Sequence, residues 1–193
     1  MPRGDSVNDW TADVPQQYER WSSVVDHLLR AAPGSFLLQF DKSDAYRSVR
    51  LRGVEHHLTG FHVPGKGFYY SPNCPFGFKA SAFLWPRFQS LFLRLLSRRL
   101  GTPVADLHVW VDDCMLVLSP CVTDALAMFS CVVAAAHRYG FDLHAVKLYL
   151  ARRVTFLGVE IDMVDAHSPA LQAVRGHRAP AGSPGPRVVA LDR

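Results

Sequence analysis

Three aspartates are the residues of this 193-residue chain best placed to do chemistry. Asp41 directly follows the apolar run 36–40, and Asp112 and Asp113 stand between two further apolar runs. If these runs are neighbouring strands, the carboxylates meet at one sheet edge, where they repel one another unless cations neutralise them. Mg²⁺ suits such a cluster, because it takes one or two protein carboxylates together with phosphate oxygens. Two such ions would activate a hydroxyl and stabilise the departing oxygen in a phosphoryl transfer.

An Asp-Asp pair at a hairpin tip is also ordinary turn chemistry, so Asp112 and Asp113 alone would decide little. They belong to a series of four motifs: Asp41-Lys-Ser-Asp-Ala-Tyr46, Pro75-Phe-Gly77, Trp110-Val-Asp-Asp113 and Phe156-Leu-Gly158. These motifs stand in the order found in reverse transcriptases, and the chain resembles that family over most of residues 36–162. Within the family the chain looks similar to retrotransposons that carry a tyrosine recombinase (the DIRS type), in Ser6-Val-Asn-Asp9 and in the stretch 156–162.

The resemblance implies a set of site residues. Asp41 and Asp112 would hold two Mg²⁺ ions, with Mn²⁺ as the alternative metal, and Asp113 would complete the catalytic and metal-binding cluster. Trp110 stands where the family usually has the Tyr that opens its aspartate turn. The nucleotide-binding residues would be Ala45, Tyr46, Phe76, Gly77 and Lys147, and the residues that contact primer or template would be Trp110, Phe156, Leu157 and Gly158.

Several of these implied roles have a plainer alternative. Tyr46 matches the family's aromatic residue that lies under the sugar and selects against a 2′-hydroxyl, and its plainer alternative is a core tyrosine. Gly77 would let the backbone approach template and nucleotide closely. Lys147, eleven positions before Gly158, resembles the family lysine that protonates the pyrophosphate leaving group, or it is a solvated surface charge. The stretch 156–158 resembles a hairpin that grips the primer end, or it is an edge strand with a glycine bulge.

The composition is that of an ordinary globular protein, with 49% hydrophobic and 20% charged residues. The net charge of +4, from 21 basic and 17 acidic residues, is too small an excess to predict nucleic-acid binding by itself. Four cysteines without a Cys-x-x-Cys pair are typical of reduced thiols in an intracellular protein, with nucleus or cytoplasm left open. No membrane span is expected, because the apolar stretch 83–100 is broken by Pro86 and four arginines.

The hydrophobic pattern predicts an α+β fold in which helices pack on one face of an antiparallel sheet. The resemblance implies that this fold is a polymerase palm with part of the fingers. Strands are expected at 36–40, 46–51, 57–63, 68–70, 104–110, 114–118 and 154–161, with a hairpin turn at 65–67. Helices are expected at 21–29, 81–100 and 123–139, the last capped by Pro120 and Thr123. We expect a lead-in with partial fingers over residues 1–35, the palm and fingers core over 36–165, and a disordered tail over 166–193.

The predicted function is RNA-directed DNA polymerisation, the templated addition of a dNTP to a primer 3′-hydroxyl on RNA or DNA, with no membrane partner. The alternatives are a non-catalytic nucleic-acid-binding remnant of such a polymerase and an unrelated α/β protein whose motifs match by chance. The intact acidic triad favours the polymerase, because a binder has no need of three mutually repelling carboxylates. Thumb, ribonuclease H and recombinase sequences are not recognisable, and we expect them to be encoded elsewhere or lost.

Overall fold

The computed structural model describes residues 6–13, 19–101 and 106–164. The chain divides into two compact units. The first, called here the hairpin unit, comprises Met1–Gln17 and Ser43–Phe92, and the second, the sheet unit, comprises Tyr18–Lys42 and Leu93–Arg193. The tail predicted over residues 166–193 lies outside the described residues.

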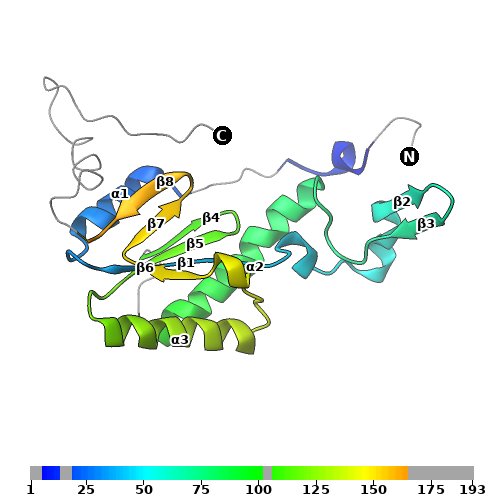
Figure 1. The fold of residues 1–193 in the computed structure, drawn as a ribbon. Helices are drawn as coiled ribbons and strands as arrows, with labels where there is room; N and C mark the ends of the chain where they lie inside the picture. The colour runs from blue at the N-terminus through cyan, green and yellow to red at the C-terminus, as the bar shows by residue number, and fades with distance from the viewer. Residues whose placement is uncertain (1–5, 14–18, 102–105, 165–193) are drawn as a thin grey trace, which may run out of the picture. The chain divides into compact units, whose positions relative to one another are not determined.

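The sheet unit is built on a four-stranded antiparallel sheet in the order β4-β5-β1-β6 (Figure 1). Its strands are β1 (Phe36–Asp41), β4 (Leu107–Trp110), β5 (Asp113–Leu118) and β6 (Tyr149–Ala151). The apolar run of β1 becomes a central strand, in which Leu37, Leu38 and Phe40 are completely buried. Strand β1 pairs with β5 over its whole length, so the position of Asp41 is fixed by the register of the sheet.

Both faces of this sheet are covered. Helix α1 (Trp21–Arg30) and the hairpin of β7 (Arg153–Phe156) and β8 (Val159–Asp162) lie on one face, and α3 (Val122–Arg138) runs along the other (Figure 1). The core on the α1 side consists of Val24, Leu28, Leu37, Met115, Val154, Phe156, Ile161 and Met163. Removing these side chains from water stabilises the unit by roughly 1.5–3 kcal/mol for each large residue.

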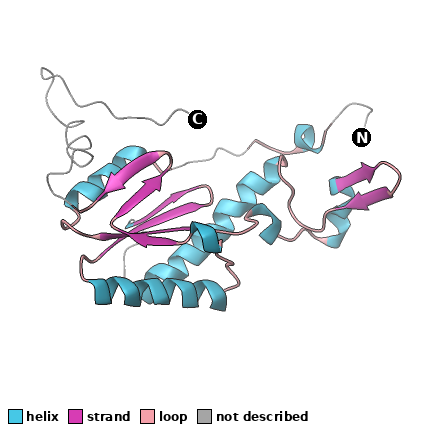
Figure 2. Ribbon diagram, viewed as in Figure 1, coloured by secondary structure: helices cyan, strands magenta, loops and turns pink. Residues whose placement is uncertain are grey.

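The hairpin unit contains short elements and one two-stranded sheet (Figure 2). Strands β2 (Gly60–Val63) and β3 (Gly67–Tyr70) form an antiparallel hairpin. Three 3-10 helices accompany it: η1 (Val7–Trp10), η2 (Tyr46–Ser48) and η3 (Gly53–Thr59). Helix α2 (Lys79–Leu100) contributes residues to both units, and Gly101, with a φ of 66°, ends it in the left-handed conformation. No helix in the described part of the chain has the length and hydropathy needed to cross a bilayer.

The α+β fold class is confirmed, and several strand predictions are wrong in detail. Residues 46–51 do not form a strand, because Asp44 takes a φ of 52° and its carbonyl accepts a hydrogen bond from the Ser48 N–H at 3.0 Å. This local bond bends the chain into η2. Of the strand predicted over 57–63 only Gly60–Val63 is extended, since the preceding residues form η3.

The last predicted strand, 154–161, is a hairpin. Leu157 and Gly158 have φ values of 52° and 78°, and such a pair of positive φ angles reverses the chain in the type of tight turn favoured between twisted strands. Strand β6 was not predicted. The predicted cap of the third helix is also wrong, since the N-cap residue of α3 is Cys121 and Thr123 lies inside the helix.

Candidate active site

The three aspartates lie at one end of the sheet. Asp41, the last residue of β1, is register-paired with Asp113, the first residue of β5, and directly opposed residues of an antiparallel pair share a face. Asp112 lies in the two-residue turn that connects β4 to β5, which the pairing of Trp110 with Asp113 closes. The fold therefore brings together carboxylates that are about seventy positions apart in the sequence.

The turn that carries Asp112 is strained. Val111, its first residue, has a φ of 59°, a region that glycine occupies freely and a β-branched residue very rarely. Holding an L-residue there costs on the order of 1–2 kcal/mol. The pairing of β4 with β5 on both sides holds the turn in this conformation, so the orientation of Asp112 is fixed by the sheet.

The charges of the three carboxylates are only partly compensated. Asp41 is 4% exposed, and its Oδ1 is buried without a hydrogen-bond partner. Burial raises the pKa of Asp112, and the charge of Asp41 raises it further. Burial also raises the pKa of Asp113, followed by the charges of Asp112 and Asp41. The site thus resists simultaneous ionisation of its acids, as expected where a cation is the missing partner.

Among the described residues, no group of three or more His, Cys, Asp and Glu side chains forms a ready-made metal cage. Mg²⁺ does not require one, because it commonly takes one or two protein carboxylates and completes its shell with water and substrate phosphates. The unpaired Oδ1 of Asp41 and the raised pKa values of Asp112 and Asp113 fit an oxygen-seeking divalent cation. Asp41 and Asp112 are the residues that could hold it.

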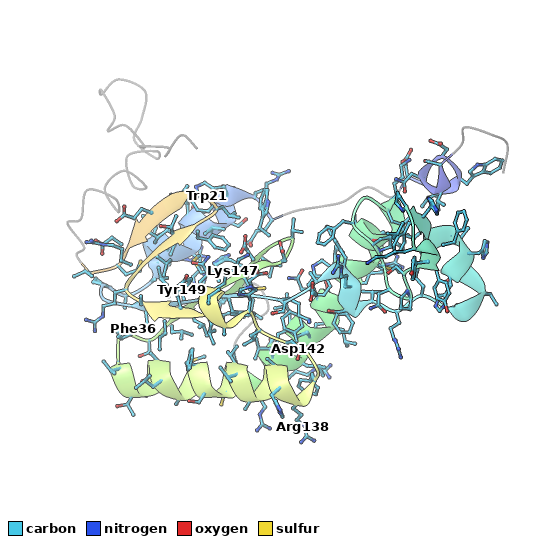
Figure 3. All side chains as sticks on the ribbon, turned by 45° about the vertical axis from the view of Figure 1, so that its right-hand side comes forward. Trp21, Phe36, Arg138, Asp142, Lys147 and Tyr149 are labelled. Carbon is cyan, nitrogen blue, oxygen red and sulfur yellow. The ribbon has the colours of Figure 1, made fainter. Side chains whose placement is uncertain are left out.

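Lys147, labelled in Figure 3, contacts Asp41: its Nζ donates to Asp41 Oδ2 at 2.6 Å. The backbone places it there: the His144 N–H donates to the Asp41 carbonyl at 2.9 Å, and Lys42 forms an isolated bridge with Leu143. The 3-10 helix η5 (Ala145–Lys147) follows. The hydrogen bond to Asp41 and the charge of that carboxylate raise the pKa of Lys147, so its ammonium keeps its proton at neutral pH.

The predicted nucleotide-binding residues Ala45, Tyr46, Phe76 and Gly77 belong to the hairpin unit. The Tyr46 ring lies edge-on to that of Phe76, with 5.2 Å between centroids, while Ala45 is buried and Phe76 is largely exposed. Gly77 has a φ of 79° and open space where a Cβ would lie, so its backbone conformation is what calls for glycine. Their contact with a nucleotide stays a prediction.

The predicted primer- or template-contacting residues differ in exposure. Trp110 and Leu157 are each 36% exposed, and Gly158 lies beside Leu157 at the tip of the β7–β8 hairpin. Phe156 instead lies in the hydrophobic core, where its ring stacks on that of Trp21 at 6.4 Å. Any contact of this hairpin with a primer would therefore involve its tip, and the role of Phe156 would be to support it.

The sequence profile of the family described as reverse transcriptase (RNA-dependent DNA polymerase) matches residues 3–161. The chain belongs to the reverse transcriptase family. No curated protein is significantly similar to it in sequence.

Solved reverse transcriptases share the fold of this family member. The foamy viral protease-reverse transcriptase dRH in complex with double-stranded DNA matches 92% of the chain with a TM-score of 0.66 and 20% identity. The foamy viral protease-reverse transcriptase in complex with an RNA/DNA hybrid matches 78% of it with a TM-score of 0.61 and 20% identity. These matches cover 29% and 19% of the solved chains, so the chain spans less than a third of either relative.

Sequence reasoning missed two sets of supporting residues in this reverse transcriptase. Asn8 holds the Pro75-Phe-Gly77 segment, since its Nδ2 donates to the Gly77 carbonyl at 2.6 Å and its Oδ1 accepts from the Lys79 N–H at 2.8 Å. In the sequence, the stretch Ser6-Val-Asn-Asp9 stands out only as a mark of subtype. Because 69 and 71 positions separate Asn8 from these partners, no local pattern could have suggested this role.

The second set is a partly buried chain of polar side chains that joins Glu19 and His27 to β4. Glu19 Oε1 accepts from His108 Nδ1 at 2.8 Å and its Oε2 accepts from the Val109 N–H at 3.0 Å. His108, 1% exposed, meets His27 Nδ1 through its Nε2 at 2.7 Å. Residues 89 and 81 positions apart make these contacts, so no local pattern could reveal them.

Proposed function

We propose that the chain catalyses RNA-directed DNA polymerisation as the palm-centred part of a reverse transcriptase. The reaction would be attack of a primer 3′-hydroxyl on the α-phosphate of a dNTP, with release of pyrophosphate. The observation that carries the proposal is the meeting of Asp41, Asp112 and Asp113 at one end of the sheet, with a buried, unpaired oxygen on Asp41. Membership of the family supports it.

Asp41 and Asp112 would hold the metal ions, and Asp113 would complete the negative field around them. Bound Mg²⁺, with Mn²⁺ as the alternative, supplies positive charge that favours the ionised primer hydroxyl and the phosphate oxygens. The carboxylates would position the reacting groups on a rigid sheet end, and positioning of this kind contributes most of the rate in phosphoryl transfer. Because the turn at Val111 is held by two paired strands, Asp112 needs little reorganisation.

Lys147 would act on the leaving group. A lysine ammonium carries its proton at neutral pH, and that proton could pass to the departing pyrophosphate as negative charge develops there. In the chain without ligands the ammonium neutralises Asp41 Oδ2. If Asp41 held a cation instead, the Lys147 ammonium would be free to contact the nucleotide.

The remaining predicted contacts complete the proposal. Tyr46, with Ala45 beside it, would select against a 2′-hydroxyl through its rigid ring, and Phe76 and Gly77 would face the nucleotide. Trp110 and the hairpin tip at Leu157 and Gly158 would contact the primer end or template.

The proposed substrates are taken from the similar structures. The foamy viral proteins were solved with double-stranded DNA and with an RNA/DNA hybrid, and we propose that this chain binds a primer-template of either kind. We further propose an intracellular retrotransposon of the tyrosine-recombinase (DIRS) type as the source. The motifs at 6–9 and 156–162 and four free thiols support this assignment.

The test is single-nucleotide incorporation into a labelled DNA primer on an RNA template with Mg²⁺, because one addition does not require processive movement. Asp112→Asn should abolish incorporation, while Asp124→Asn, an exposed carboxylate at the start of α3, should leave it unchanged. Incorporation that survives Asp112→Asn would refute the site. A folded chain that binds primer-template and never extends it would favour the non-catalytic binder instead.

A further inference from the structure

Lys42 is a buried lysine next to the proposed active site. It directly follows Asp41 and continues β1 through its isolated bridge with Leu143, and its side chain is only 2% exposed. Successive residues of an extended strand point to opposite faces of a sheet. Asp41 shares the face of Leu37, which packs in the core on the α1 side. The Lys42 side chain therefore lies on the other face, along which α3 runs (Figure 1).

Two contacts of the Lys42 ammonium reach the segment that follows α3. Its Nζ lies 5.7 Å from the centroid of the Phe141 ring and 3.8 Å from Asp142 Oδ2. Phe141 is 1% exposed, whereas the Asp142 side chain is 81% exposed. A cation–π contact contributes most where water is excluded, and an ion pair with an exposed carboxylate contributes little. Of these two contacts, the one with the Phe141 ring is therefore the stronger.

The same segment leads to Lys147. It begins at Phe141, three residues after the end of α3, and the His144 N–H donates to the Asp41 carbonyl at 2.9 Å. The Lys147 N–H donates to the His144 carbonyl at 2.9 Å, and its Nζ donates to Asp41 Oδ2 at 2.6 Å. The end of β1 thus holds this segment at two points, through its backbone at His144 and through the Lys42 side chain at Phe141.

Stability alone does not explain a lysine at position 42. A buried ammonium loses its hydration, and an apolar side chain in the same place often serves stability equally well or better. Leu38 and Phe40 precede Lys42 on the same face of the strand, and both are completely buried. An apolar side chain would simply extend that row. The cation is therefore better explained by the segment that it holds in place.

We propose that Lys42 is a positioning residue for the site. Its ammonium, held over the Phe141 ring, fixes the start of the segment 141–147, and this keeps Lys147 against Asp41. Because Lys42 faces away from the three aspartates, it acts only through Lys147. The inference rests on the proposed function for the part that Lys147 plays in the reaction, whereas the placement of the segment can be tested without metal, nucleotide or turnover.

Hydrogen–deuterium exchange of the full chain tests this placement. In Lys42→Met the backbone amides of His144 and Lys147, both hydrogen-bonded in the wild type, should exchange on the order of tenfold faster, because a desolvated cation–π contact is lost. Phe141→Leu, which removes the ring and keeps the lysine, should have the same effect. Lys42→Arg keeps a cation over the ring and should retain the wild-type rates. Unchanged exchange in α1 shows that the fold is kept.

Mn²⁺ affinity without nucleotide, followed by electron paramagnetic resonance of the free ion, connects the segment to the site. A loosened Lys147 competes less for Asp41, so Lys42→Met should lower Kd about twofold, the lower end of the coupling expected between residues of one network. Adding Lys42→Met to Lys147→Met should change Kd no further. Lys66→Met removes an equal charge from the exposed turn between β2 and β3, and it should change neither Kd nor exchange.

Unchanged exchange at His144 and Lys147 in Lys42→Met, or an unchanged Kd for Mn²⁺, would overturn the proposal. So would a twofold effect on Kd that persists in the Lys147→Met background, because the Lys42 charge would then act on the metal directly. Lys42→Arg that behaves like Lys42→Met would show that the cation over the ring holds nothing. If the wild type binds no Mn²⁺, the proposed function fails, and the exchange rates still decide the role of Lys42.

Discussion

Replacing Lys147 by Met should tighten metal binding and at the same time slow catalysis. In the free chain the ammonium occupies Asp41 Oδ2 at 2.6 Å, so a cation that binds this carboxylate must displace it. A hydrogen bond between charged groups contributes about 1.5–3 kcal/mol. The Lys147 side chain is 52% exposed, and solvent screening reduces that figure to about 1 kcal/mol. Removing the competitor should therefore strengthen metal binding about fivefold.

The effect on the reaction has the opposite sign, because the variant lacks the proton for the leaving group. Losing a general acid typically slows a reaction by about 100-fold or more. Two assays check the pair of effects: Mn²⁺ affinity without nucleotide, followed by electron paramagnetic resonance of the free ion, and single-nucleotide incorporation at saturating metal. Arg138→Met, which removes an exposed cation from the last turn of α3, is the control for general charge and should change neither.

Equal or weaker Mn²⁺ binding by Lys147→Met would refute the competition for Asp41. Tighter binding with undiminished incorporation would keep the competition and reject the role in proton transfer. The two readouts therefore test separate parts of the proposed site with one substitution.

Three further predictions concern stability. The raised pKa of Asp112 means that stability falls as the pH rises through its folded pKa, so Asp112→Asn should stabilise the metal-free chain at pH 7. A gain of roughly 1 kcal/mol would appear as about 2–4 °C in Tm, and Asp124→Asn should give none. Burial and the neighbouring His108 lower the pKa of His27, so the folded chain loses stability as the pH falls below 6.5. In urea titrations, the free energy of unfolding of His27→Gln should therefore depend less on pH in this range. Val111→Gly should raise Tm by relieving a strain of about 1 kcal/mol, yet slow incorporation because the turn loosens; an unchanged rate would show that the strain plays no part in positioning.

Much of the sheet could be predicted, because its strands are short apolar runs ended by turn residues. The apolar run at 36–40 predicts strand β1 with Asp41 at its end. The two apolar runs on either side of Asp112-Asp113 predict a turn at these residues. The failures lie where a local bond overrides the pattern. Residues after Asp44 alternate like a strand, but one left-handed residue and the bond from Ser48 bend them into a 3-10 helix.

The acids of the site and Lys147 could be predicted as site residues, but the contacts between Lys147 and the acids could not, for a physical reason. A metal-binding carboxylate must be an Asp or Glu at a strand end, so its type and place are visible in the sequence. The groups that hold it can come from anywhere in the chain: Lys147 reaches Asp41 because of backbone contacts of Asp41 and Lys42 with residues 143 and 144. Its contact is a property of the fold alone.

The polar chain behind β4 extends this reasoning to the catalytic turn. A carboxylate of Glu19 that accepts from His108 Nδ1 leaves His108 Nε2 as an acceptor for the His27 N–H, so one tautomer satisfies both rings. Glu19 also holds the Val109 N–H, one residue before Trp110 at the end of β4. Because β4 leads directly into the turn at Val111 and Asp112, these partly buried contacts hold the strand that positions Asp112, the proposed metal ligand. The 2.7 Å between His27 Nδ1 and His108 Nε2 accommodates one proton. A second proton between these two nitrogens would set two N–H groups against each other and disturb the strand that positions Asp112.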